Sequence, residues 1–173
     1  MTILERLLGH DAWTTRQLLL RCRELSDEQL DQQFDIGDKS LRQTFVHMLE
    51  CMELHLDRMN GKPERELAED YTVEGLLKRQ SATSKELADL ALRAERDNRL
   101  DEFWGQRKRT LGAGIVHLIT HSMHHRAQAL YILEKLGVKE VIEGDALGWE
   151  SVARGWGWAD GGSEGRPVSE WDY

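Results

Sequence analysis

The segment from Thr110 to Gly137 constrains the fold more than any other stretch, because it combines a long helical pattern with four of the seven histidines. Apolar residues recur along it at the three- and four-residue spacing of one helix face: Leu111, Ile115, Leu118, Ala129, Leu133 and Leu136. Gly137 follows as a helix stop. At about 100° per residue, His121 and His125 fall on the flank of the apolar stripe. The pattern therefore predicts a helix that carries imidazoles beside a core.

Three more amphipathic patterns precede this segment, and they predict helices over about 2–23, 40–60 and 72–98. Possible helix caps with the capping-box spacing begin at Thr2, Ser26 and Ser40. The apolar arc of the 40–60 helix is wide, so this helix is expected to pack on two sides, with His47 at the edge of the arc. Four long helices with short or moderate connections predict an all-α four-helix bundle. Residues 99–109 are interpreted only as a connection.

The composition favours a helical protein of the cytosol. There are two prolines in 173 residues, and the net charge is -8, with basic residues scattered among acidic ones, which argues against nucleic-acid binding. No apolar run is long enough to span a membrane, and the N-terminus lacks the pattern of a signal peptide. Cys22 and Cys51 lie at helical spacing among apolar residues, so both are expected to be reduced and buried. A cytoplasmic location follows as the expectation.

The C-terminal part differs in character, because the stretch from Val138 onward is rich in glycine and holds four of the six tryptophans. A short helical turn is expected near 147–153, followed by irregular chain. The predicted organisation is a bundle domain over 1–150 and an irregular Gly/Trp-rich tail over 151–173. The tryptophans are expected to pack back on the bundle or on a second subunit.

His121 and His125 have the i, i+4 spacing that lets two imidazoles chelate one ion from consecutive helical turns. His47 is the candidate third ligand, because its helix is expected to neighbour the histidine helix in a bundle. Three imidazoles would leave coordination positions open, which is typical of a catalytic ion rather than a structural one. The spacing alone leaves a second interpretation open, in which the three are separate core-edge histidines bonded to backbone or carboxylates.

The other histidines are weaker candidates. His117 and His124 project toward the polar side of their helix. Each is therefore expected to be a hydrogen-bonding partner of a ligand or a surface residue, in preference to a ligand itself. His10 and His55 show no partner spacing and are interpreted as ordinary.

Three residues near the predicted ligands have more than one interpretation. Gln128 and Arg126 flank the histidine ladder, where either could orient an imidazole, hold a substrate carboxylate or simply lie on the surface. Cys51, one turn after His47, is interpreted as a small buried hydrophobic residue in preference to a ligand or nucleophile.

The chain also resembles a known family in three segments. The segment TLGAGIVHLITHSMHHRAQAL, 110–130, is similar to the last-helix signature H-x3-H-R-G-Q of the DinB/YfiT-like superfamily, with Ala127 in place of the usual glycine. HDAWTTRQLL, 10–19, resembles the first-helix pattern, and TFVHMLECMELHL, 44–56, resembles the segment that supplies the first metal histidine. The segments occur in the family's order, and the resemblance covers about 1–150.

The resemblance implies an up-down-down-up four-helix bundle that binds one divalent metal ion (Zn, Ni, Fe or Mn) through His47, His121 and His125. It implies a metal-dependent thiol S-transferase, with a low-molecular-weight thiol as cosubstrate, or a hydrolase. Either would act on a small electrophilic substrate in detoxification or stress response, and a homodimer is expected. The competing hypothesis is a non-catalytic, stress-associated interaction module with a structural or vestigial metal site.

Overall fold

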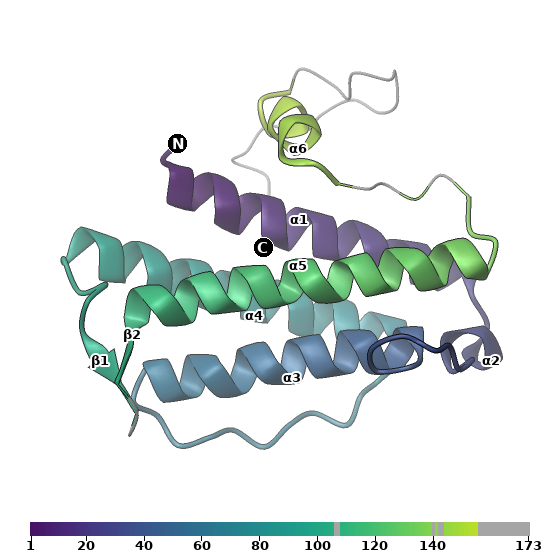
Figure 1. Ribbon diagram of the computed structural model, residues 1–173, viewed down its shortest axis with the longest axis horizontal. Coiled ribbons are helices and arrows are strands. Elements are labelled where there is room, and N and C mark those ends of the chain that lie inside the picture. The colour runs from purple at the N-terminus through teal and green to yellow at the C-terminus, as the bar shows by residue number, and fades with distance from the viewer. Residues whose placement is uncertain (106–107, 140, 142–143, 156–173) are drawn as a thin grey trace.

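Four long helices form the body of the protein in the computed structural model, which describes residues 1–105, 108–139, 141 and 144–155 (Figure 1). They are α1 (Ile3–Arg21), α3 (Leu41–Met59), α4 (Val73–Arg96) and α5 (Leu111–Lys135). Helices α3 and α4 run in one direction, and α1 and α5 run in the other. The predicted all-α, up-down-down-up bundle is confirmed.

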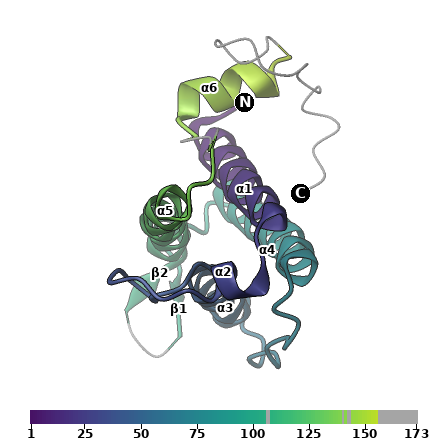
Figure 2. The same ribbon diagram turned by 90° about the vertical axis from the view of Figure 1, so that its right-hand side faces the viewer.

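The end view shows how the helices surround one core (Figure 2). Helix α1 lies beside α4 and α5, and α3 also lies beside α4 and α5, so α1 and α3 are diagonal to each other. Because α3 and α4 are parallel neighbours, the segment 60–72 must return along the length of the bundle to join them. This arrangement places α3 and α5 side by side and antiparallel, as the predicted histidine site requires.

Polar side chains fix where the helices begin. The hydroxyls of Thr2 and Ser26 complete capping boxes at α1 and at the short helix α2 (Asp27–Leu30), after a 3₁₀ turn over Cys22–Glu24. Ser40 caps α3 by accepting the backbone N–H of Gln43, and Thr110 caps α5 in the same way. Each such bond satisfies a backbone donor that the helix cannot pair, and contributes about 1 kcal/mol.

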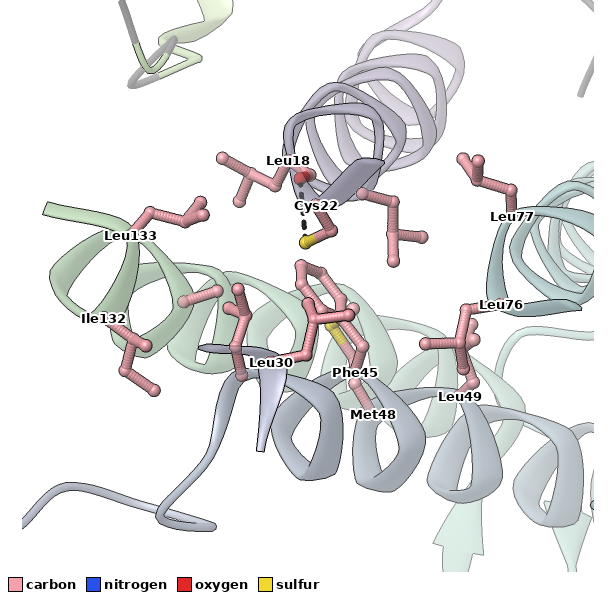
Figure 3. Packing of buried hydrophobic residues seen from close by; sticks show 13 residues of the cluster. Leu18, Cys22, Leu30, Phe45, Met48, Leu49, Leu76, Leu77, Ile132 and Leu133 are labelled. Carbon is pink, nitrogen blue, oxygen red and sulfur yellow. Dashed lines mark hydrogen bonds between the residues drawn. The ribbon is translucent and has the colours of Figure 1, made fainter. Parts of the chain in front are cut away.

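The core is formed by two apolar clusters along the bundle, and Figure 3 shows one of them. Leu18 of α1, Phe45 of α3, Leu76 of α4 and Leu133 of α5 meet there, each almost fully buried. Cys22 belongs to the same cluster and its Sγ donates to the Leu18 carbonyl at 3.4 Å. Burial raises the pKa of this thiol to about 12. The predicted buried, reduced state is therefore confirmed for Cys22.

The connection before α5 contains structure that the sequence pattern did not predict. Strands β1 (Phe103–Trp104) and β2 (Arg109–Thr110) pair antiparallel, with Phe103 opposite Thr110. The indole N–H of Trp104 donates to the Thr110 carbonyl at 2.9 Å. Strands of two residues are too short to show an alternating pattern, which explains why periodicity missed them.

The predicted turn near 147–153 is confirmed as helix α6 (Ala146–Ala153), which Asp145 caps. Its Trp149 is buried against α1 next to Trp13, and a Cβ at Gly9 would come within 2.5 Å of the indole. The predicted domain division at residue 150 falls within α6. The remaining tail tryptophans lie outside the described residues. Among the helices that are described, none is long and apolar enough to cross a bilayer.

Candidate metal centre

Helices α3 and α5 bring the three predicted ligands together. The ring centroid of His47 lies 5.3 Å from that of His121 and 4.7 Å from that of His125, and the last two rings are 4.4 Å apart. One nitrogen from each ring lies within 4.8 Å of the others. We call this group of His47, His121 and His125 the imidazole cluster. Its residues come from two rigid helices, as chelation of one ion requires.

The imidazole nitrogens face one another. His121 Nε2 and His125 Nε2 are 3.2 Å apart, and His125 Nδ1 lies 2.8 Å from Gln128 Oε1. If Nδ1 of a neutral His125 donates to that amide oxygen, Nε2 carries the lone pair and points into the cluster. The other end of the Gln128 amide lies 3.0 Å from His124 Nε2, consistent with donation from the amide nitrogen. Gln128 thus orients an imidazole, which is one of the three roles that its position in the sequence predicts.

Buried polar atoms around the cluster support ligation over the alternative of separate hydrogen-bonded histidines. Within the described chain, His121 Nδ1 is buried and has no hydrogen-bond partner. Its Nε2 faces a second imidazole instead of a backbone carbonyl or a carboxylate. Polar groups in protein interiors are usually hydrogen-bonded, so an incompletely paired ring beside two other rings fits a shared cation.

The loop before α3 supplies a carboxylate that sequence reasoning missed. Asp38 Oδ2 lies 3.6 Å from His125 Nδ1 and is buried without a hydrogen bond among the described residues. Gly37, with φ of +47°, lets the loop approach, because a Cβ there would overlap the Gln128 side chain. A carboxylate behind a histidine is a common outer partner in metal sites. Asp38 lies in a loop, and nothing in the local sequence pairs it with a histidine on a distant helix.

The surroundings keep the rings of His121 and His125 neutral. Burial, followed by the neighbouring imidazoles, lowers the pKa of His121 to about 4. Burial also lowers the pKa of His125, although the Gln128 hydrogen bond opposes the shift. Neutral imidazoles are the form that binds metal ions, so the nitrogens are available as ligands at neutral pH.

The other candidate residues of α5 lie outside the imidazole cluster. His117 and His124 are exposed, as expected from their side of the helix. Arg126 points away from the imidazole cluster and forms a buried ion pair with Asp11 of α1. The role of Arg126 is therefore packing between α5 and α1, and none of its three predicted roles applies.

His55, interpreted from sequence as ordinary, lies in a second group with Cys51 and His117. One donor atom from each of these residues lies within 4.8 Å of the other two. Cys51 is half-buried, so the expected full burial of its thiol is not found. The i, i+4 spacing of Cys51 and His55 was the available signal, but it needed the position of His117 to become informative. We call Cys51, His55 and His117 the thiol cluster.

Comparison with known proteins agrees with the geometry. A family model described as the DinB family matches residues 1–149. A comparison with curated proteins gives no significant match. The match contains all four bundle helices and both histidine-bearing segments, as the resemblance implied. The chain belongs to the DinB family.

Proposed function

We propose that this protein is a metal-dependent enzyme that holds one divalent ion, Zn, Ni, Fe or Mn, through His47, His121 and His125. The reaction is thiol S-transfer to a small electrophile or hydrolysis of one. The observation that carries the proposal is the convergence of three imidazoles on one point between α3 and α5, with donor atoms within 4.8 Å of one another. Imidazole is a good ligand for all of these ions, so the donor set fits.

The exposure of the cluster favours a catalytic ion over a structural one. His47 is exposed while His125 is 7% exposed, so the group is closed on the core side and open at His47. Three protein ligands leave a coordination position for a small molecule. When bound, the ion would supply Lewis acidity, lowering the pKa of a thiol or of water.

The protein's own groups prepare this site. The Gln128 amide oxygen lies within hydrogen-bond distance of His125 Nδ1 and holds the ring with Nε2 toward the cluster, while the Asp38 carboxylate, 3.6 Å from Nδ1, favours a proton on that atom. The rings of His121 and His125 stay neutral because burial lowers their pKa. All three histidines are ligands in this arrangement, so none of them serves as nucleophile or general base.

The apolar core argues against the alternative of a structural ion in a non-catalytic module. Both core clusters are assembled from the helices' own apolar stripes, which bury a continuous apolar interior. The bundle is therefore expected to fold without metal. A structural ion would instead make a large contribution to folding.

Elemental analysis of the purified protein tests the proposal. The wild type should retain a divalent ion that His121→Ala lacks, while circular dichroism shows the same helix content. Chelation should lower the melting temperature only modestly and leave the fold intact. If reconstituted wild type and variant hold the same amount of metal, the assignment of the ligands is wrong.

Activity is then screened with the metal-loaded protein. Thiol transfer is measured as consumption of a low-molecular-weight thiol with an electrophilic acceptor, and hydrolysis is measured with activated esters and amides. The proposed chemistry requires that activity disappear in both His47→Ala and His121→Ala. Activity that survives in either variant would contradict a mechanism that depends on metal at the imidazole cluster.

A further inference from the structure

The thiol cluster occupies the same seam between α3 and α5 as the imidazole cluster, further toward the β1–β2 end. Cys51 and His55 lie one turn apart on α3, and His117 approaches from α5, its ring centroid 5.5 Å from that of His55. The three donor atoms lie within 4.8 Å of one another. A tetrahedral zinc ion holds its ligand atoms about 3.3–3.7 Å apart, so small side-chain rotations would bring all three to one ion.

The local hydrogen bonding prepares His55 for ligation. Its Nδ1 lies 2.8 Å from the Cys51 carbonyl, with geometry for donation to that oxygen. In a neutral ring this bond leaves Nε2 with a free lone pair. Metal-bound histidines commonly donate their second nitrogen to a backbone carbonyl in this way, which fixes the ring orientation. Cys51 Sγ lies 3.6 Å from the same Nδ1 atom, so the thiol has to rotate toward Nε2 for the two residues to share an ion.

A pocket gives access to the two histidines of the cluster. It has a volume of about 420 Å³ and is lined by His55, Trp104, Arg109, Ala113, Gly114 and His117. The Trp104 wall is held by its hydrogen bond to Thr110, and Gly114 permits its approach because a Cβ there would come within 3.1 Å of the indole nitrogen. An ion could enter through this pocket, which also leaves room for water or another ligand at a fourth position.

We propose that Cys51, His55 and His117 form a second metal site, selective for a thiophilic divalent cation such as Zn²⁺. A thiolate and two imidazoles make a softer donor set than three imidazoles, so this site favours Zn²⁺ over Mn²⁺ more strongly than the imidazole cluster does. Binding releases the thiol proton of Cys51 to solvent and forms a sulfur–metal bond. No oxidation or reduction is involved.

The two sites are neighbours but use different residues. The ring centroids of His117 and His121 are 5.6 Å apart, and these residues belong to the thiol and imidazole clusters respectively. No ligand is shared, so either site can be removed by substitution while the ligands of the other remain. The second site can therefore be tested whether or not the imidazole cluster binds metal.

Titration of the full-length, metal-free protein with Co²⁺ tests the inference, because Co²⁺ bound to thiolate gives a charge-transfer absorption in the near ultraviolet that histidine ligands do not give. The wild type should show this band. Cys51→Ser should abolish it and lower the Co²⁺ stoichiometry by one equivalent. His47→Ala should keep the band, since it removes only a ligand of the imidazole cluster. Cys22→Ser is the matched thiol control and should also keep the band.

Alkylation of Cys51 by iodoacetamide, located by mass spectrometry, gives a second measurement that needs no cysteine variant. Zn²⁺ should slow alkylation at Cys51 at least tenfold, and His117→Ala should remove most of this protection. In His117→Ala, Ni²⁺ bound at the imidazole cluster should give Cys51 little protection against alkylation.

The outcomes distinguish the two sites. Absence of the charge-transfer band in folded wild type with excess Co²⁺, or a band that persists in Cys51→Ser, would overturn the second site. A band in wild type that is lost only in Cys51→Ser, with a total of one equivalent bound, would support the second site and contradict metal binding at the imidazole cluster.

Discussion

His125 and Arg126 are adjacent residues of α5, and because successive side chains of a helix point about 100° apart, they face different neighbouring helices and meet very different partners. Arg126 faces α1 and pairs with the Asp11 carboxylate, both side chains being about 5% exposed. His125 faces α3 and meets two further imidazoles. On the Arg126 side the buried charges are complementary. On the His125 side three groups of the same kind converge.

The difference shows how the bundle separates stability from ligand binding. A buried ion pair satisfies itself, and losing one partner leaves an uncompensated charge. The three imidazoles do not satisfy one another fully, as the unpaired His121 Nδ1 shows within the described chain. A shared cation would satisfy them. The α1/α5 contact therefore belongs to the scaffold, and the proposed metal site lies at the α3/α5 contact.

The largest expected effect comes from breaking the scaffold side. Asp11→Ala should lower the free energy of unfolding by about 3–5 kcal/mol, because it leaves the Arg126 guanidinium buried without its carboxylate. Urea denaturation measures the change. The double variant Asp11→Leu with Arg126→Met should recover much of the loss. Equal stability of Asp11→Ala and wild type would show that the pair does not have this role.

The ligand side should behave in the opposite way. At a metal concentration of 100 times the dissociation constant, the wild type should gain about 2.7 kcal/mol of stability, whereas His47→Ala should gain almost none. Without metal, His47→Ala should differ from wild type by less than about 1 kcal/mol, because His47 is exposed. The measurement uses Ni²⁺, and both proteins carry Cys51→Ser so that the thiol cluster is absent. If His47→Ala is unfolded without metal, His47 contributes to the stability of the bundle itself.

The orienting role of Gln128 predicts a smaller effect. Gln128→Leu should weaken metal binding about 10–100-fold, since His125 loses the acceptor for Nδ1. Calorimetric titration measures this, and Glu134→Ala, at an exposed position on the same helix, is the matched control. Unchanged affinity in Gln128→Leu would show that Asp38 alone suffices to hold the ring.

The smallest effect is a pH dependence of the metal-free protein. His121 has a folded-state pKa of about 4 against an ordinary 6.5, so between these values the unfolded chain binds the proton and the folded chain does not. Stability should therefore fall as the pH is lowered from 6.5 toward 4. His121→Asn should show a shallower fall over the same range. An identical slope in both proteins would contradict the lowered pKa.

The bundle could be predicted because each helix carries its own pattern and caps. Leu111, Ile115 and Leu118 mark one face of α5 without reference to any other helix, and Ser26 with Gln29 marks the start of α2. The imidazole cluster was predictable in part. His121 and His125 share a helix, but His47 became a candidate only through the expected bundle and the family resemblance.

The parts that were not predicted depend on contacts between separate elements. Asp38 reaches His125 because a loop folds over α5, and no local pattern encodes that approach. His55 gains its partners only when α3 and α5 pack antiparallel in this register. The β1–β2 pairing likewise rests on two-residue strands whose meaning comes from the register Phe103 to Thr110.

Whether His47, His121 and His125 share one metal ion can be measured as the Ni²⁺ stoichiometry of the Cys51→Ser protein and of the same protein with each histidine changed in turn to alanine. Cys51→Ser should bind one equivalent, and each of the three further variants should bind none, all with unchanged helix content. Full occupancy in any one of the three would contradict a site built from all of them.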